Sequence, residues 1–287
     1  DSNHLCQFPQ SEKTYNFETI NGVNVCWIKT FKYVKTASIG RVLSWFDFEW
    51  KLFRLDKKKF TRPDVVIISS LSLLTVFYGV YLKKFYKSKL ILEIRDIWPL
   101  TMIAEGGFKN YHPLVLFLAW VEKIGYKNAD LVVGTMPRLD LHVRNVLGYD
   151  RPFYCSPIGF HNSKLDINKG RDELSKYFPK NKVIVGYSGS IGLTNNLLPY
   201  IDTIKEFASN ENVHFVFAGS GDLSEKLKKE LRLQSNVTFL GKIRSDYVPT
   251  FLSFCDILYL STHKSIVWDY GQSMNKVLEY MLAGKPI

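Results

Sequence analysis

Short apolar runs alternate with amphipathic stretches along most of the chain. Val65–Ser69 is a continuous apolar run, the pattern of a strand buried in a parallel sheet. Residues 1–22 are polar and are expected to be irregular. Further strands are predicted at Val23–Ile28, Lys89–Ile94, Asp130–Val133 and Pro152–Ser156, with helices at Val42–Leu55, Leu71–Lys84, Pro113–Lys127 and Arg138–Val146. This alternation indicates βα units around a parallel sheet.

A second alternating series follows the loop Ser156–Gly170, whose Pro157, Gly159 and Gly170 mark a domain boundary. Its strands are predicted at Val183–Tyr187, His214–Ala218, Val237–Leu240 and Ile257–Leu260, and its helices at Asn196–Ser209, Asp222–Leu233, Tyr247–Phe254 and from Ser273 onward. The sequence therefore predicts an α/β protein with two domains, residues 1–165 and 166–287. Two facing Rossmann-like domains would bind a ligand in the cleft between them.

Composition supports a folded chain and excludes several classes of protein. The chain has 287 residues, of which 46% are hydrophobic and 15% aromatic, enough to build substantial cores. The four cysteines are far apart in sequence, which argues against a disulfide or metal framework and fits a reduced cytosolic setting. The longest apolar stretches, Leu71–Leu82 and Pro113–Val121, are shorter than the roughly 20 residues of a membrane-spanning helix.

The positive charge is concentrated in the first half. Residues 1–165 carry 23 Lys+Arg against 14 Asp+Glu, whereas residues 166–287 carry 15 against 13. A basic first half indicates an anionic partner, and no nucleic-acid-binding motif is present. An anionic membrane surface fits the runs Lys57–Lys59 and Lys83–Lys89, the second of which interleaves bases with aromatic residues. Solvated basic faces would give the same runs.

The C-terminal stretch predicts a short helix with a binding face. Ser273 is a suitable N-cap, and Gly284 is suitable for the residue after the helix. Lys276 and Glu279 are neighbours on one helix face, as are Asn275 and Glu279. A cation near a helix N-terminus binds phosphate, and a carboxylate one turn deeper can accept hydrogen bonds from a pair of hydroxyls. A diphosphate beside a ribose offers both groups, although an ordinary surface helix would carry the same residues.

Two further places carry candidate chemistry. Gly189, Ser190 and Gly192 lie in a turn between a predicted strand and a helix, where backbone amides can bind a phosphate. Arg95 and Asp96 follow a parallel strand, and Asp96 could take a proton from an acceptor hydroxyl or only cap the turn. A carboxylate in the next loop, Glu105, is a second catalytic candidate. The sequence has no Asp-x-Asp metal motif, so no metal is expected.

Several segments resemble family-4 glycosyltransferases of the GT-B fold, in particular the branch that builds bacterial capsules and O-antigens. The most specific are EIRDIWP, which begins at Glu93, and NKVLEYMLAGKP, which begins at Asn275. The glycine turns at Gly186–Gly192 and Phe217–Gly221 are weaker matches. In that family the carboxylate matching Glu279 binds the nucleotide ribose. The resemblance also implies a first strand before Asp1 and further elements after Ile287, so the chain is expected to be a fragment.

Departures from the family pattern change the expected site. Gly271 stands where the family has a first carboxylate that contacts the donor sugar. Ser190 and Asn195 stand where many members carry Arg and Lys, so the diphosphate charge must be met elsewhere. Lys276 is the first candidate for this role. Lys242 and Arg244 are further candidates on a later loop.

The resemblance implies a retaining, metal-independent glycosyltransferase at the inner face of the cell membrane. It would move a sugar, an N-acetylated hexosamine carried by UDP, onto a lipid-linked saccharide or polyprenyl phosphate. The nucleotide-sugar is a co-substrate, and no cofactor is expected. Two alternatives remain open. One is a sugar-nucleotide epimerase of the same fold, and the other is a catalytically inactive nucleotide-sugar-binding scaffold, which the two departures above would explain.

Overall fold

The computed structural model describes residues 13–33, 39–70, 72–159, 166–192 and 195–287. The chain divides into two compact units. The first unit comprises Asp1–Ser156 and Asp269–Gly271, and the second comprises Pro157–Trp268 and Gln272–Ile287. The predicted boundary, between residues 165 and 166, adjoins residues 160–165, which lie outside the described part of the chain.

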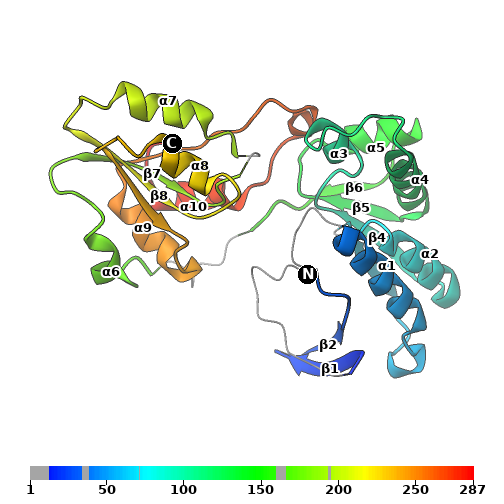
Figure 1. The fold of residues 1–287 in the computed structure, drawn as a ribbon. Helices are drawn as coiled ribbons and strands as arrows, with labels where there is room; N and C mark the ends of the chain where they lie inside the picture. The colour runs from blue at the N-terminus through cyan, green and yellow to red at the C-terminus, as the bar shows by residue number, and fades with distance from the viewer. Residues whose placement is uncertain (1–12, 34–38, 71, 160–165, 193–194) are drawn as a thin grey trace. The chain divides into compact units, whose positions relative to one another are not determined.

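A four-stranded parallel sheet forms the centre of the first unit (Figure 1). The strand order follows the sequence: β3 (Val65–Ser69), β4 (Lys89–Ile94), β5 (Leu131–Gly134) and β6 (Phe153–Cys155). Each crossover moves one strand along in the same direction, and right-handed crossovers then place the connecting helices on one face. Those helices are α2 (Thr75–Tyr86), α3 (Leu100–Ala104), α4 (Pro113–Asn128) and α5 (Leu139–Leu147).

Strand side chains of the first unit are buried on the face of the sheet that the connecting helices cover. On the helix side of the sheet, Val66, Leu90 and Val132 are buried. On the other side, Ile67 is 67% exposed. The long helix α1 (Ile39–Arg54) and the short 3-10 helix η1 (Lys57–Lys59) precede the sheet. The predicted start of the second helix, Leu71, is outside the described residues.

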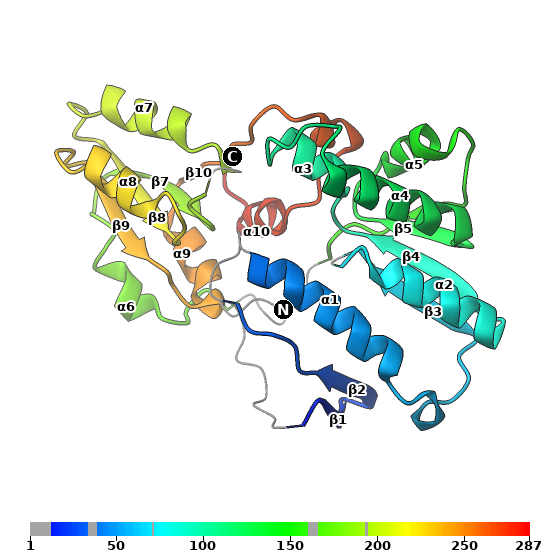
Figure 2. The same ribbon diagram turned by 45° about the vertical axis from the view of Figure 1, so that its right-hand side comes forward.

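The N-terminal region departs from the prediction. Residues 15–20 form a strand, β1 (Tyr15–Ile20), which pairs antiparallel with β2 (Val23–Ile28). The expected irregular segment is therefore wrong for these residues, and β2 is not part of the parallel sheet. Asn21 and Gly22, both with positive φ, form the two-residue turn that joins the strands, as is typical of tight hairpins. The hairpin lies beside α1, where the Tyr15 hydroxyl donates to the Lys51 carbonyl at 2.7 Å (Figure 2).

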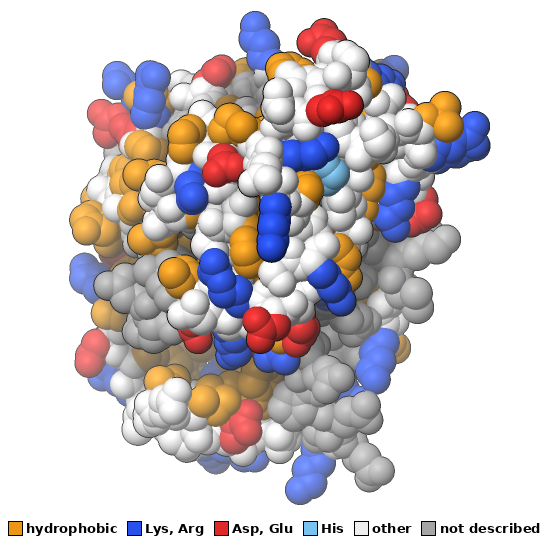
Figure 3. Space-filling view, turned by 90° about the vertical axis from the view of Figure 1, so that its left-hand side faces the viewer, with side chains coloured by type: hydrophobic (Ala, Val, Ile, Leu, Met, Phe, Trp, Pro, Cys, Tyr) orange, Lys and Arg blue, Asp and Glu red, His pale blue; other side chains and the backbone are white. Residues whose placement is uncertain are grey.

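The second unit is built on another parallel sheet, in the order β10–β7–β8–β9. The strands are β7 (Val183–Ser188), β8 (Val213–Ala218), β9 (Val237–Gly241) and β10 (Ile257–Leu258). Its helices are α6 (Arg171–Ser175), α7 (Leu198–Glu206), α8 (Ser224–Glu230), α9 (Val248–Phe254) and α10 (Asn275–Ala283), with the 3-10 helix η4 (Ser245–Tyr247). The 3-10 helix η5 (Ile266–Tyr270) begins in this unit, and its last two residues belong to the first unit. Basic and acidic side chains are interspersed on the face shown in Figure 3.

Two hydrophobic clusters hold this sheet between helices. Tyr187, Phe215 and Phe217 pack with α7 and α8, whereas Ile184 and Val216 pack with α9 and α10. Because β8 is buried on both faces, its sequence is a nearly continuous run of apolar residues. Burying a large side chain of this kind stabilises the fold by about 1.5–3 kcal/mol.

The start of α10 also differs from the prediction. The helix begins at Asn275, and its N-cap residue is Met274, whose side chain makes no capping bond. Ser273 is therefore not the N-cap. Its hydroxyl instead accepts a 2.9 Å bond from the Ile158 amide at the beginning of the unit. The helix ends as predicted at Gly284, which has a left-handed conformation.

A short piece of the C-terminal half belongs to the first unit. The Tyr270 carbonyl accepts a 2.9 Å bond from the Arg138 amide, and the Tyr270 ring meets His142 edge-on. His142 in turn lies 2.7 Å from Glu122, a buried carboxylate that also accepts a bond from Tyr126. Residues 269–271 are thus packed into the first unit directly before α10 of the second.

Candidate functional site

The sheet order places a topological switch point beside β7. From β7 to β9 the chain moves in one direction, and it then returns to the other side of β7 to form β10. Ligands of open α/β sheets bind outside the carboxyl ends of the strands at such a point. The loop after β7 begins with Gly189, so this predicted turn is located where a ligand is expected.

Two glycine loops are in close backbone contact at this edge. The Gly189 amide donates to the Ala218 carbonyl at 2.9 Å, and the Ile191 amide donates to the Ser220 carbonyl at 3.0 Å. Gly219 has φ +152°, and a Cβ atom there would lie 1.8 Å from the Gly189 carbonyl oxygen. Only glycine allows the two loops to approach this closely.

We expect Gly219→Ala to destabilise the second unit by about 3 kcal/mol or more, because it adds a backbone clash to an unfavourable conformation. Gly192→Ala is the matched control, since a Cβ there meets only the Ser190 hydroxyl, at 3.6 Å. It should change stability by less than about 0.5 kcal/mol. Chemical denaturation and hydrogen exchange of β7 and β8 measure both. Equal stability of the two variants would contradict the close contact of the loops.

Helix α10 is anchored to the end of β7 by Tyr280. The hydroxyl of this fully buried residue accepts a 3.0 Å bond from the Ser188 amide. Burial raises the pKa of Tyr280 to about 12, so the phenol stays neutral. The anchor fixes the position of Lys276, one turn earlier in the helix.

Lys276 lies beside the glycine turn. Its Nζ donates to the Tyr187 hydroxyl and to Asn195 Oδ1, both at 2.9 Å. A Cβ atom on Gly189 would lie 2.9 Å from Lys276 Cε, so the stem of the lysine passes directly over this residue. Burial lowers the pKa of Lys276 to about 8, while the charge of Glu279 acts in the opposite direction. The structure thus brings together a cation and an exposed glycine turn.

The remaining predicted donor residues occupy different places. Glu279 is half-buried on the same face of α10 as Lys276, while Asn275 is exposed at the first position of the helix. Ser190 is exposed, and its carbonyl accepts a 2.6 Å bond from Tyr187. Ser273 lies before the helix, on the Ile158 amide.

The two bases after β9 are arranged differently from Lys276. Lys242 is exposed directly after the strand, at the same edge of the sheet as Gly189 and Gly219. Arg244 binds Asp246 through two contacts, at 3.0 and 2.8 Å, and lies 5.1 Å from the centre of the Tyr247 ring. Arg244 thus contributes to a local surface network.

The catalytic candidates of the first unit lie at the carboxyl end of its sheet. Arg95 and Asp96 are exposed and directly follow β4. The Arg95 amide donates to the Ser70 hydroxyl at 2.9 Å, and the Asp96 carbonyl accepts a bond from the Trp98 amide. Glu105 is half-buried and ends α3, and the loop from Gly106 to Pro113 lines an open hollow. These candidates belong to one unit and the nucleotide candidates to the other.

Sequence reasoning missed the side chains that position Lys276. Tyr187 lies in an apolar strand, and Tyr280 lies among apolar residues of a helix, so the sequence alone predicts that both are ordinary core residues. Only the pairing of α10 with the end of β7 shows that their hydroxyls point to the ligand edge. No cluster of three or more His, Cys, Asp or Glu residues that could hold a metal occurs among the described residues. Within the same part of the chain, no helix is long and apolar enough to cross a membrane.

A family model matches most of the second unit. The family Glycosyl transferases group 1 matches residues 182–287, which include β7, Lys276 and Glu279. No curated protein matches the sequence.

Solved structures resemble the chain in fold at low sequence identity. Anabaena HepE, solved in complex with UDP and glucose, is 17% identical with a TM-score of 0.53, over 78% of this chain and 58% of that chain. Sucrose-phosphate synthase from Thermosynechococcus elongatus is 16% identical with a TM-score of 0.67, over 96% and 67% of the two chains. The catalytic domain of Arabidopsis thaliana starch synthase IV, bound to ADP and acarbose, is 11% identical with a TM-score of 0.62, over 94% and 66%.

The chain therefore spans about 58% of the length of HepE. Its two α/β units with parallel sheets confirm the predicted GT-B class of fold. Residues 182–287 match the glycosyl transferases group 1 family, and this match supports a glycosyltransferase.

Proposed function

We propose that the protein is a glycosyltransferase whose second unit binds the nucleotide-sugar donor. The position of Lys276 supports this most strongly, because a half-buried ammonium group is held beside an exposed glycine turn at the switch point. The family match of residues 182–287 covers the same elements. HepE, which resembles the chain in fold, was solved with UDP and glucose.

The groups proposed to contact the donor are those that do not already donate a hydrogen bond to the neighbouring loop. The amides of Gly189 and Ile191 bind the neighbouring loop, so the diphosphate would be met by the amides of Ser190 and Gly192 and by Lys276. Among the described residues, Lys276 donates two bonds to protein oxygens, and an ammonium has three donors, so within this part of the chain a third proton is left for a phosphate oxygen. This charge would stabilise the departing diphosphate. Glu279, one turn deeper, would accept the ribose hydroxyls.

We expect Glu279→Gln to weaken nucleotide binding by about 1.5–3 kcal/mol, the usual size of a hydrogen bond to a charged group. Calorimetry with UDP measures the effect. Glu225→Gln is the control, because Glu225 is an exposed carboxylate near the start of α8 in the same unit. Equal affinity of the wild type and Glu279→Gln would remove Glu279 from the site.

The finer assignments are also proposals. The transferred sugar would be an N-acetylated hexosamine from UDP, moved with retention and without a metal. The acceptor would be a lipid-linked saccharide or polyprenyl phosphate used in bacterial surface polysaccharides, at the inner face of the membrane. The basic first unit supports an anionic lipid acceptor.

A donor panel tests the proposal directly. The full-length protein would be incubated with UDP-, GDP- and dTDP-sugars, with and without lipid-linked acceptors. The products would be separated by chromatography and identified by mass spectrometry. Transfer to an acceptor is the expected result. An epimer formed from the donor alone would indicate an epimerase, and nucleotide binding without any product would indicate an inactive scaffold.

A further inference from the structure

Helix α1 has apolar residues on its outer face. Leu43, Phe46, Trp50 and Phe53 are spaced by three or four residues, so they form one stripe, and each is 40–64% exposed. The buried face instead contains Ser44 and Glu49. The Ser72 hydroxyl donates to Glu49 at 2.9 Å, and burial raises the pKa of this carboxyl to about 7. On the side opposite the stripe, Trp45, Phe48 and Leu52 are half-buried, so the helix is apolar on both sides. A helix that only covered a core in water would be polar on its outer side, so the exposed stripe indicates a binding surface.

Helix α4 extends this apolar surface. Leu116, Phe117 and Trp120 are 37–57% exposed. The Trp120 ring lies 5.7 Å from Phe77 of α2, and Phe53 of α1 lies 5.0 Å from Tyr78 of α2. The three helices are therefore joined by aromatic contacts. We call the exposed apolar residues of α1 and α4 the aromatic face.

The exposed charged residues on these helices are basic. Among the described residues of α1, α2 and α4, the carboxylates are Asp47, Glu49 and Glu122, and each is buried or nearly so. Exposed basic residues remain on these helices, among them Arg54, which lies 5.7 Å from the Trp50 ring centre. The half-buried Lys57 of the neighbouring η1 lies 5.1 Å from the Tyr81 ring centre. Asp56, the N-cap residue of η1, is an exposed acid beside them. The described residues of the three helices themselves present bases and aromatics without exposed acids, which matches the interface of an anionic bilayer.

The basic run Lys83–Lys89 contributes less to this surface than its sequence indicates. Lys83 binds the Asp130 carboxylate at 2.7 Å and the Asn128 carbonyl at 2.8 Å, so it holds α2 to the sheet. Lys84 and Lys87 are exposed.

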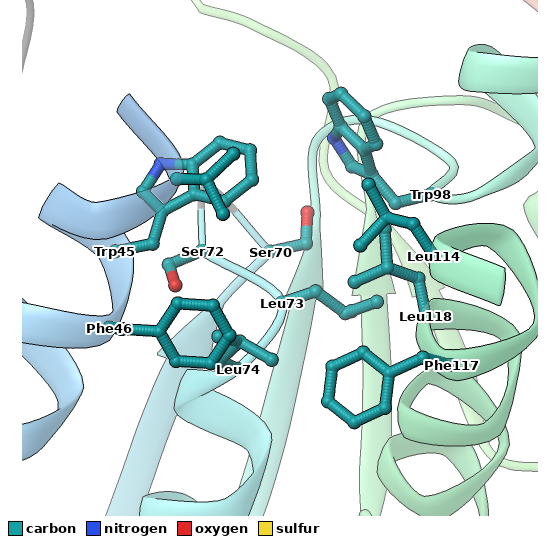
Figure 4. A pocket seen from close by; sticks show the side chains of 11 residues that line it. Trp45, Phe46, Ser70, Ser72, Leu73, Leu74, Trp98, Leu114, Phe117 and Leu118 are labelled. Carbon is teal, nitrogen blue, oxygen red and sulfur yellow. The ribbon is translucent and has the colours of Figure 1, made fainter. Parts of the chain in front are cut away.

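An apolar pocket lies between α1 and α4 (Figure 4). The space along its lining is about 440 Å³ when the open solvent at its mouth is counted, so the enclosed part is much smaller. Phe46 and Phe117 line it and also belong to the aromatic face, so the pocket is continuous with that face. Its remaining walls are apolar except for two serines, and the lining includes Trp45, Ser70, Ser72, Leu73, Trp98 and Leu118.

The far end of the pocket reaches the strand-end loop. Ser70 accepts the Arg95 amide at 2.9 Å, and Trp98 lies two residues after Asp96. The Trp45 and Trp98 rings meet edge-on with centres 6.4 Å apart. A hydrocarbon chain in this pocket would therefore have its polar head close to the loop of Arg95 and Asp96.

We propose that the aromatic face docks on an anionic bilayer and that the pocket takes the hydrocarbon chain of the lipid acceptor. The bilayer follows from the apolar stripe and the exposed basic residues of these helices. The identification of the chain with the acceptor rests on the proposed function.

Vesicle flotation tests the docking face. The full-length protein should bind vesicles of phosphatidylcholine with phosphatidylglycerol better than phosphatidylcholine alone, and less at high salt. Trp50→Glu should weaken this binding roughly tenfold or more. Leu233→Glu, at a residue 84% exposed in the second unit, should not. Equal binding by wild type and Trp50→Glu, or to neutral and anionic vesicles, would overturn the docking face.

A pocket-filling variant tests the hydrocarbon site. Val42 lines the pocket from α1, and Val42→Trp should weaken binding of farnesyl phosphate roughly tenfold while vesicle binding and UDP affinity stay unchanged. Inorganic phosphate should not compete with farnesyl phosphate. Unchanged farnesyl phosphate binding in Val42→Trp would overturn the pocket assignment. If no sugar of the donor panel is transferred while lipid binding is intact, the proposed function would be overturned and the assignment of the lipid surface would be kept.

Discussion

We expect Asp96→Asn to lower turnover by about 10²–10⁴-fold, the usual contribution of a general base. Asparagine keeps the size of the side chain but removes its charge and proton affinity. Asp96 follows β4 at the carboxyl edge of the first sheet, whereas the nucleotide candidates lie in the second unit. Nucleotide affinity should therefore stay nearly constant. Initial rates with saturating donor, and calorimetry with UDP, measure the two effects separately.

A structural role of Asp96 gives a different outcome. If the side chain only supports the turn from Ile97 to Pro99, the variant should melt at a lower temperature with normal turnover per folded molecule. Asp150→Asn is the control, because this carboxylate of the first unit is 80% exposed. Normal specific activity of Asp96→Asn would end the catalytic assignment, and Glu105 would be tested next.

The second large effect concerns the charge at the glycine turn. Lys276→Met should weaken UDP binding by about 2–4 kcal/mol, because it removes a half-buried cation that would contact the diphosphate. This corresponds to roughly 30- to 1000-fold in affinity. Lys229→Met, at an exposed lysine of α8, is the matched control and should bind UDP normally.

The same lysine predicts a pH dependence. Its pKa is lowered to about 8 by burial, and the groups that face it are Glu279, Asn195 and the neutral phenol of Tyr187. A bound diphosphate favours the protonated lysine, so binding takes up a proton above pH 8. Affinity should fall as pH rises through about 8, by up to about tenfold per pH unit. Lys276→Met should show no such fall, and an equally steep fall in that variant would assign the titration to another group.

The sequence predicted the parallel sheets because their strands carry a clear apolar signal. Val183–Ser188 and Val213–Ala218 are buried on both faces, and they read as near-continuous apolar runs. The hairpin of Tyr15–Ile20 was missed because its residues are mostly exposed and do not form such a run. Its available signal was the Asn21-Gly22 pair, a strong hairpin turn when strands flank it.

The site was predicted in outline but not in its supporting contacts. Helical spacing places Lys276 and Glu279 on one face of α10 without any tertiary information. The contact of Lys276 with Tyr187 and Asn195 depends on how α10 packs against β7, residues more than 80 positions away. Ser273 was misassigned as a cap because its Ile158 partner is equally remote, 115 positions away. Local patterns identify residues on one element, whereas pairings between distant elements require the fold.

The segment Asp269–Gly271 has a practical consequence for dividing the protein into halves. The chain passes between the units at residues 156 and 157, again at 268 and 269, and a third time at 271 and 272. A fragment that ends in the loop after Ser156 would lack Tyr270, so the His142 ring would keep Tyr126 but lose the aromatic neighbour supplied by the C-terminal half. A fragment that begins there would carry three residues whose binding place is on the missing half. Expressing either half as an intact unit therefore requires transplanting this tripeptide, and swapping halves between related proteins requires moving it with the N-terminal half.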